Sequence, residues 1–312
     1  MNTEAISRIH IPVMLAETME ALAPHAGGRY LDGTIGLGGH AEAILAHAPD
    51  IELCGLDRDN EALQLARQRL GKFGDRVHLF HMPYSEFPVA LNELGWECVD
   101  GALLDLGVSS FQLDNPHRGF SFRESGPLDM RMDADAVTKN AWHLVNRGSH
   151  TILRDCIAML GEEPQAGRIA KKIIEARQKV PINDTASLAD IILHAYPPAW
   201  RRSAKRHPAT RTFQALRMAV NDELGQLEIF LNEITRWLAP GGRVVIISFH
   251  SLEDRLVKRA MKEWAKEPEK GVPSFQILYK KPLVPGENEI ASNPRASSAK
   301  FRAALRVQDD DK

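Results

Sequence analysis

Four glycines within nine residues are the first sign of chemistry in this chain. The stretch Asp32–His40 reads DGTIGLGGH and lies between a short apolar run and an alanine-rich segment with helical spacing. Glycine adopts positive φ readily and lets the backbone approach a ligand, and a helix that starts near Gly39 directs unpaired N–H groups at whatever lies above it. The pattern predicts a turn that holds a nucleotide-like ligand.

Two carboxylates end apolar runs that predict buried strands. Asp57 follows Ile51–Leu56, about twenty residues past the glycines, where a carboxylate suits the two hydroxyls of a ribose. Asp105 follows Gly101–Leu104, a run too apolar to lie at the surface. An isolated buried carboxylate is costly, so Asp105 at the end of a strand indicates a ligand or substrate contact. The alternative for Asp105 is an N-cap on the next helix.

The elements that position these residues alternate between short β-rich runs and helical runs from Tyr30 to Asp105, the rhythm of a doubly wound parallel sheet. In such a sheet, ligands bind beyond the carboxyl ends of the strands, where the glycine turn, Asp57 and Asp105 all fall. The expected strands are 30–31, 53–56, 77–80, 99–104 and 242–249, and the expected helices are 41–48, 61–70 and 252–264.

The alternation stops in the middle of the chain. Residues 114–211 contain no convincing buried strand, but Ile169–Lys179 and Ser187–Ala195 have helical spacing of apolar residues. A further helix is expected over Thr212–Leu238, before the Pro-Gly-Gly turn. We therefore predict a sheet domain in two parts, residues 1–113 and 212–312, with an inserted helical domain over residues 114–211.

The last two predicted strands help to distinguish between two classes of nucleotide-binding protein. Phe275–Lys280 and Phe301–Val307 fit two strands of an antiparallel hairpin at the sheet edge. This ending resembles the S-adenosylmethionine methyltransferases with a seven-stranded sheet. A nicotinamide-dependent oxidoreductase stays an alternative, because Gly36, Gly38 and Ala41 form a loose G-x-G-x-x-A. That alternative leaves the Asp105 loop and the hairpin unexplained.

Composition limits the function only broadly. The 39 Lys and Arg residues balance 41 Asp and Glu, so a surface for an anionic partner must be local. Three separated cysteines and the lack of a signal peptide or membrane span predict a reduced cytoplasmic protein. His250 and the pair His78 and His81 lack the carboxylate or cysteine spacing of a metal site, so we predict none.

Seven blocks of sequence, in order along the chain, resemble those of the bacterial RsmH family, also called MraW. The blocks are His10–Met14, Asp32–His40, Leu104–Ser110, Arg118–Phe122, Gly126–Asp133, His207–Arg217 and Ser248–Arg255. The family methylates the exocyclic N4 of a cytidine in the peptidyl-site region of 16S ribosomal RNA, with S-adenosylmethionine as the methyl donor. The resemblance implies a Rossmann-like seven-stranded sheet, a substrate-recognition role for the inserted domain, and the small ribosomal subunit as partner.

The resemblance also implies the residues of the cofactor site. The expected cofactor contacts are Gly38, Gly39, His40, Asp57, Tyr84, Asp105 and Gln112. Asp57 would bind the ribose, Tyr84 would lie near the adenine, and Asp105 would supply negative charge near the sulfonium. Family members often have proline where this chain has Phe111, which weakens the assignment of Gln112.

Methyl transfer to the cytosine amine requires an acceptor for its N–H bonds, and Asp105 or the backbone carbonyls of Leu106–Ser109 is where we expect it. Phe111, Phe120 and Phe122 either stack on an extruded base or form the core of the inserted domain. Two basic clusters could bind RNA phosphates. The first is Arg201, Arg202, Lys205, Arg206, Arg211 and Arg217, and the second is Arg168, Lys171, Lys172, Arg177 and Lys179.

Two further questions stay open at this point. A protein that keeps the fold but only binds RNA during ribosome assembly would associate with small subunits without turnover. The intact set of cofactor contacts argues against that alternative. A homodimer is also compatible with the sequence.

Overall fold

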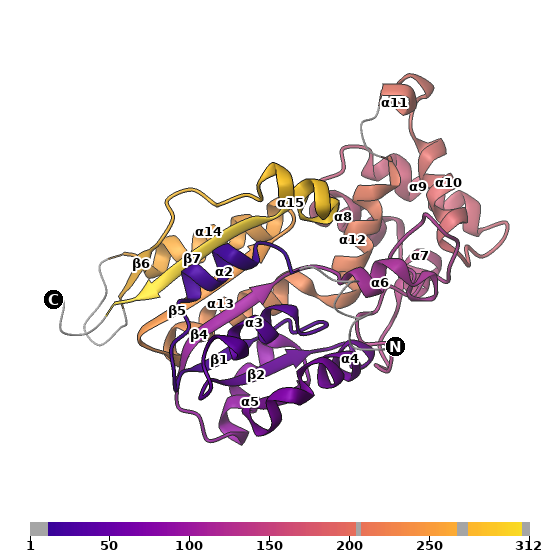
Figure 1. Cartoon of the computed structure of the whole chain (residues 1–312). Coiled ribbons are helices and arrows are strands. Elements are labelled where there is room, and N and C mark those ends of the chain that lie inside the picture. Colours follow the sequence, from indigo (N-terminus) through magenta and orange to yellow (C-terminus); the bar gives the residue numbers. More distant parts are fainter. Residues whose placement is uncertain (1–11, 204–206, 267–273, 308–312) are drawn as a thin grey trace. The chain divides into compact units, whose positions relative to one another are not determined.

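A computed structural model describes residues 12–203, 207–266 and 274–307, and helices and strands carry the labels of Figure 1. The chain divides into two compact units. Unit 1 contains residues 1–107 and 224–312, and unit 2 contains residues 108–223. The two units are described separately below.

Unit 1 is built on a seven-stranded sheet with the order β3-β2-β1-β4-β5-β7-β6. The first five strands in this order are parallel, and β7 runs antiparallel to both β5 and β6. This confirms the predicted methyltransferase-type sheet and its antiparallel hairpin at the edge. The strands are β1 Arg29–Asp32, β2 Glu52–Asp57, β3 Val77–His81, β4 Val99–Asp105, β5 Leu238–Ser248, β6 Phe275–Ile277 and β7 Lys300–Arg306.

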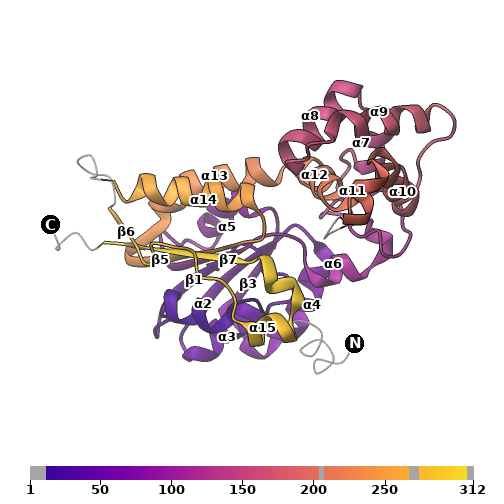
Figure 2. The same ribbon diagram turned by 90° about the horizontal axis from the view of Figure 1, so that it is seen from above.

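Helices cover both faces of this sheet (Figure 2). Apolar residues of α5, α13 and α14 pack on one face, and those of α2, α3 and α4 pack on the other. The helices of unit 1 are α2 Leu15–Leu22, α3 Gly39–His47, α4 Asn60–Leu70, α5 Phe87–Glu93, α13 Glu223–Trp237, α14 Ser251–Trp264 and α15 Glu287–Ser292.

The central strands are apolar throughout because both of their faces are buried. On β4, Ala102 and Leu104 belong to one core while Leu103 belongs to the other. On β5, Val244 and Ile246 face one core, while the alternate residues face the other. Successive side chains of a strand point to opposite faces, so a run without polar alternation marks a strand covered on both sides. This arrangement leaves the strand ends as the places for polar chemistry.

Unit 2 is helical, and its described residues pair as strands only in an isolated bridge between Pro127 and Asp184. A single apolar cluster forms its core. Its helices are α6 Ser110–Asp114, α7 Ala141–Arg147, α8 His150–Gly161, α9 Ala166–Arg177, α10 Thr185–Ala195, α11 Pro198–Ser203 and α12 Ala209–Asn221. Unit 2 extends beyond the predicted segment 114–211 at both ends, to residues 108 and 223.

The stretch Thr212–Leu238, predicted to be helical, is helical as far as Trp237. The segment forms two helices, α12 and α13, because the chain turns at Asp222, whose φ is 48°. Apolar residues of α12 belong to the core of unit 2, whereas those of α13 pack on the sheet of unit 1. Among the described residues, no helix combines the length and apolar character needed to cross a membrane.

Candidate functional site

Backbone hydrogen bonds attach the glycine turn to the strands on either side of β1. The N–H of Gly33 donates to Leu103 O on β4 at 2.9 Å, and the N–H of Ile35 donates to Leu56 O on β2 at the same distance. Gly38 then precedes α3 as its N-cap, with φ 78°. The turn is therefore fixed at the carboxyl ends of three neighbouring strands, with the start of α3 beside them.

The glycines of the turn are required for different reasons. Gly38 needs a left-handed backbone, where other residues are strained. At Gly39 the constraint is space, since a Cβ there would lie 2.5 Å from Cγ of Pro12. The structure describes only Pro12–Met14 of the block His10–Met14, and the contact with Pro12 explains why residue 39 has no side chain. From the sequence, we attributed all the glycines to the approach of a ligand. At Gly39, packing against Pro12 is a second requirement.

Asp57 connects β2 to the glycine turn. Its Oδ2 accepts from the N–H of Gly36 and its Oδ1 from the N–H of Asp59, both at 2.9 Å. Burial raises the pKa of Asp57 to about 6, although these two donors oppose the rise. Each carboxylate oxygen has two lone-pair directions, so both can also accept from ribose hydroxyls. Asp57 thus lies where the sequence predicted it and keeps acceptor capacity for a ligand.

Asp32 is a buried carboxylate that the sequence analysis left without a role. It ends β1, and its Oδ1 accepts from the N–H of Thr34 at 3.1 Å. Burial raises the pKa of Asp32 to about 7, and the charge of His40 opposes that rise. An ionised Asp32 is costly at neutral pH unless positive charge lies nearby. The site is therefore suited to a cationic ligand.

Asp32→Asn should stabilise the protein at high pH and have little effect at low pH. The folded-state pKa is raised, so the unfolded chain ionises first, and stability falls as pH rises from about 4 to about 7. Asparagine keeps the acceptor for Thr34 and removes this cost. The gain at pH 8.5 should be of the order of 3–4 kcal/mol at most, at about 1.4 kcal/mol for each pH unit between the two pKa values.

Urea unfolding at about pH 4 and at pH 8.5 measures this difference. Asp50→Asn, on an exposed turn, is the matched control and should leave the free energy of unfolding unchanged at both pH values. An equal effect of Asp32→Asn at the two pH values would contradict the explanation by ionisation.

His40 and Asp105 face each other across the turn. His40 Nε2 lies 3.6 Å from Asp105 Oδ2, and the two side chains are only 6% and 17% exposed. Three buried atoms of this pair have no hydrogen-bond partner among the described residues. They are the two ring nitrogens of His40 and Oδ1 of Asp105. The N–H of Asp105 donates to Thr34 Oγ1 at 2.7 Å. Buried polar atoms normally have partners, so these open positions are places where a bound ligand would fit.

The remaining two predicted cofactor contacts lie in different units. Tyr84 follows β3 in unit 1, where its ring packs edge-on against Phe230 with centroids 5.9 Å apart. Gln112 lies in unit 2 and is buried on α6, where its Oε1 accepts from the N–H of Ser109 at 3.1 Å in a capping box. Gln112 therefore stabilises the start of α6. The sequence predicted only a cofactor contact for this residue.

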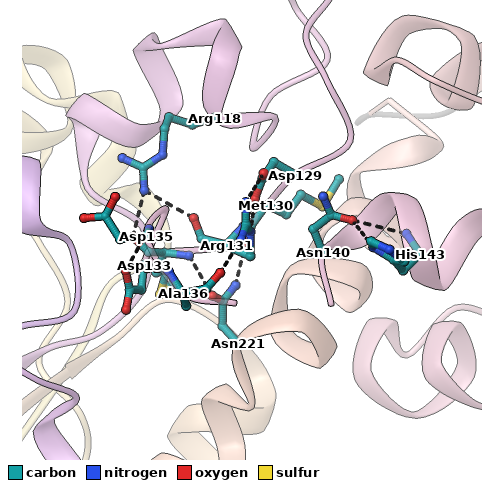
Figure 3. A network of polar contacts seen from close by, with 11 residues as sticks. Arg118, Asp129, Met130, Arg131, Asp133, Asp135, Ala136, Asn140, His143 and Asn221 are labelled. Atoms are coloured by element: carbon teal, nitrogen blue, oxygen red, sulfur yellow. Dashed lines mark hydrogen bonds and ion pairs between the residues drawn. The ribbon is translucent and has the colours of Figure 1, made fainter. Parts of the chain in front are cut away.

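A polar network in unit 2 joins two of the blocks that carry the family resemblance, Arg118–Phe122 and Gly126–Asp133, to Asn221 (Figure 3). Asn221 donates to Met130 O and accepts from the N–H of Met132, both at 2.7 Å. Arg118, which is also buried, donates to Arg131 O and Met132 O. Met130 has φ 61°, so these bonds hold the loop in a conformation that a non-glycine residue rarely adopts. The sequence analysis did not single out Asn221.

Two of the three aromatic residues considered for base stacking, Phe120 and Phe122, belong to the core of unit 2, whereas the half-buried Phe111 stays a candidate for stacking. Phe120 is a buried member of its apolar cluster, and Phe122 packs against that cluster. The ring of Phe122 lies 4.8 Å from that of Phe213 and the same distance from that of His207. For Phe120 and Phe122 the structure favours the core interpretation over stacking on an extruded base.

Some residues of the two basic clusters are engaged within unit 2. Arg217 forms a bidentate pair with Glu223, and Arg177 donates to Val145 O in the last turn of α7 and to Gly148 O just after it. These two guanidinium groups are therefore directed at the protein itself. Lys205 and Arg206 lie outside the described residues. The exposed members among the described side chains are Arg168, Lys171, Lys172, Lys179 and Arg211.

His250 has a role that its sequence context did not reveal. Its Nδ1 accepts from the N–H of Glu253 at the start of α14, and its Nε2 lies 3.1 Å from Glu253 Oε1. The sequence argument found no carboxylate suitably spaced from His250, yet residues three apart on a helix are neighbours. His250 and Glu253 together form a capping box.

Known proteins similar to this chain point to one family. The model of the MraW methylase family matches residues 7–307. "Ribosomal RNA small subunit methyltransferase H" of Desulfovibrio desulfuricans is 60% identical over 311 residues, which cover 96% of this chain and 95% of that protein. The protein of the same name from Lawsonia intracellularis is 54% identical over 310 residues, with 96% and 99% covered. A solved structure of an rRNA methylase from Streptococcus thermophilus aligns with a TM-score of 0.42 at 12% identity, covering 96% of this chain and 99% of that one.

Proposed function

The chain belongs to the MraW methylase family, and from this premise we propose that it methylates the exocyclic N4 of a cytidine in 16S ribosomal RNA. The methyl donor is S-adenosylmethionine, and the proposed target lies in the peptidyl-site region of the small ribosomal subunit. Relatives of more than 50% identity carry the name of a small-subunit ribosomal RNA methyltransferase. Family membership removes the nicotinamide-dependent oxidoreductase from consideration.

One observation in the structure carries the proposal for the cofactor. The carboxyl ends of β1, β2 and β4 bring together the glycine turn, Asp57 and the pair His40 and Asp105. Buried atoms of that pair have no partner among the described residues. S-adenosylmethionine combines a ribose with a positively charged sulfonium, and this edge of the sheet offers acceptors for the first and carboxylates for the second. The residues present therefore fit the cofactor.

Each cofactor residue has a proposed task. The start of α3 at Gly39 offers backbone N–H groups, whereas the N–H of Gly38 already donates to Ile35 O at 2.7 Å and Gly38 supplies the left-handed turn. Asp57 accepts from the ribose hydroxyls. Tyr84 provides a ring near the adenine, as the family resemblance implies. His40 and Asp105 lie toward the reacting end. Gln112 is the weakest assignment, because its Oε1 already caps α6.

The chemistry requires positioning more than acid or base strength. When bound, S-adenosylmethionine supplies a methyl group that the sulfonium already activates. The cytosine amine is a poor nucleophile because its lone pair is delocalised, so the protein must hold the nitrogen in line with the methyl at about 3–3.5 Å. Asp105 accepts a hydrogen bond from the amine and receives a proton once the nitrogen has become cationic.

Unit 2 is the proposed substrate-recognition domain. Its exposed cationic residues Lys171, Lys172 and Arg211 are candidates for contacts with RNA phosphates, which weaken as salt concentration rises. We also propose a cytoplasmic location, where small subunits are present. A homodimer stays a prediction, and sedimentation equilibrium would test it.

A labelling experiment tests the proposed function directly. The purified protein is incubated with methyl-labelled S-adenosylmethionine and small subunits from a strain that lacks the enzyme, and the digested RNA is analysed by mass spectrometry. We expect N4-methylated cytidine. If no label appears although the protein is folded and binds the cofactor, mature subunits are not the substrate. The assembly-factor alternative then regains support.

A further inference from the structure

We propose that His40 is a positioning residue for Asp105. In this proposal, His40 Nε2 holds Asp105 Oδ2 and so leaves Asp105 Oδ1 to accept the hydrogen bond from the cytosine amine. The inference rests on the proposed function, because it assigns the acceptor for that reaction to one atom. It adds to the cofactor contact that the family resemblance implies for His40.

The first argument is the burial of the pair. His40 lies at the start of α3 and is 6% exposed, and Asp105 ends β4. Neither ring nitrogen of His40 has a hydrogen-bond partner within the described part of the chain. A histidine retained only for packing normally satisfies its ring nitrogens, since a buried unpaired polar atom costs about 1–3 kcal/mol. Nε2 of the ring lies 3.6 Å from Oδ2 of Asp105.

The second argument concerns the freedom that Asp105 retains. Its backbone is fixed, because its N–H donates to Thr34 Oγ1 at 2.7 Å. The terminal torsion of an aspartate is broad, so a fixed backbone does not determine which oxygen faces a substrate. His40 Nε2 lies 3.6 Å from Oδ2, just beyond hydrogen-bond distance, and closing this gap when the ligands bind would remove this freedom. Among the described residues, Oδ1 has no partner, so it is the oxygen available to the amine.

Only one neutral tautomer of His40 can donate a hydrogen bond to Asp105 Oδ2. With its proton on Nε2, His40 donates toward Oδ2, and Nδ1 keeps a lone pair. With its proton on Nδ1, the lone pair of Nε2 would face the carboxylate and repel it.

The step balances with the groups that the proposed function names. The nitrogen lone pair forms the N–C bond as the S–C bond breaks, and the electron pair of that bond stays on sulfur. The nitrogen is then cationic and loses one proton to Asp105 Oδ1, which later releases it to water. His40 keeps its own proton throughout and acts only through Asp105.

The test compares His40→Leu, which removes the donor, with His40→Gln, which retains an amide N–H. Single-turnover methylation is measured with saturating cofactor and small subunits, so the rate reports the chemical step. We expect His40→Leu to be slower by about 100-fold, the size of effect that a misplaced catalytic group produces. His40→Gln should stay within about tenfold of the wild type, because its N–H replaces Nε2–H.

A second pair of histidine and aspartate, His25 and Asp100, provides a chemically matched control near the start of β4. His25 Nε2 lies 3.7 Å from Asp100 Oδ1, but this histidine is 60% exposed. His25→Leu should leave the methylation rate unchanged. Combining His40→Leu with Asp105→Asn should give no further loss beyond Asp105→Asn alone, because one residue acts through the other.

A second readout needs no RNA. Asp105 near the sulfonium should favour S-adenosylmethionine over the neutral S-adenosylhomocysteine, and calorimetry gives the ratio of the two dissociation constants. His40→Leu should lose that preference as Asp105→Asn does, whereas His40→Gln should keep it. If the wild type produces no N4-methylated cytidine, the proposed function fails, and this ratio alone decides the role of His40.

Three results would overturn the inference. The first is a methylation rate in His40→Leu equal to that of the wild type. The second is equally slow methylation in His40→Leu and His40→Gln. The third is a rate in the double variant that falls by the product of the two single losses. An unchanged preference for the sulfonium in His40→Leu would also overturn it. Circular dichroism of both His40 variants shows whether a slow rate comes from a folded protein.

Discussion

Asp105→Asn is expected to slow methyl transfer by about 10²–10⁴-fold while the protein stays folded, because an amide cannot take up a proton from the cytosine amine. With the amide oxygen toward Nε2–H of His40, the NH2 takes the place of Oδ1 and cannot accept a hydrogen bond from that amine. The side chain keeps its size, and the backbone N–H keeps its bond to Thr34 Oγ1. Oδ1 of Asp105 has no partner in the described structure, so the substitution breaks no hydrogen bond of that atom. The loss should therefore fall on the chemical step.

Single-turnover rates and the dissociation constant of S-adenosylmethionine separate chemistry from binding. Asp100→Asn is the matched control, since Asp100 lies on the same strand at its other end, where it accepts from the N–H of Arg29. That variant should methylate at the wild-type rate. If Asp105→Asn keeps full turnover and only binds the cofactor more weakly, Asp105 is a cofactor residue and not the acceptor.

The sequence predicted the architecture of unit 1 because the relevant signals are local. Apolar runs that end in Asp57 and Asp105 identify strands covered on both faces, and the parallel pairing of β1, β2 and β4 brings their ends together. The terminal hairpin was predicted from two β-rich runs separated by a polar loop. These inferences require only periodicity and the rule that ligands bind at the carboxyl ends of strands.

The parts that the sequence did not predict depend on contacts between distant residues. The contact of Pro12 with Gly39 and the pairing of His40 with Asp105 join separate segments of the chain. The break at Asp222 carries no glycine or proline, so no local signal marked the turn between α12 and α13 within the predicted helical stretch. Arg217 looked available for RNA, but it pairs with Glu223, six residues later.

Asn221→Ala is expected to cost about 2–4 kcal/mol in the free energy of unfolding, because two buried backbone groups lose their partners. Asn221 is only 5% exposed and ends α12. Its Nδ2 donates to Met130 O and to Arg217 O, at 2.7 and 2.8 Å, while its Oδ1 accepts from the N–H of Met132 at 2.7 Å. Met130 and Met132 then have no amide to hold the loop against the cost of the positive φ at Met130.

Urea unfolding gives the change in stability, and hydrogen exchange of peptides covering residues 128–136 locates it. Asn140→Ala, which removes the N-cap of α7 in the same unit, should cost only about 1 kcal/mol and should not expose the Met132 amide.

If unit 2 recognises the RNA, Asn221→Ala should raise the KM for small subunits more than the dissociation constant of the cofactor. Exchange at the Met132 amide as slow as in the wild type would mean that Arg118 and Arg131 hold the loop without Asn221, since their bonds to the loop are intact.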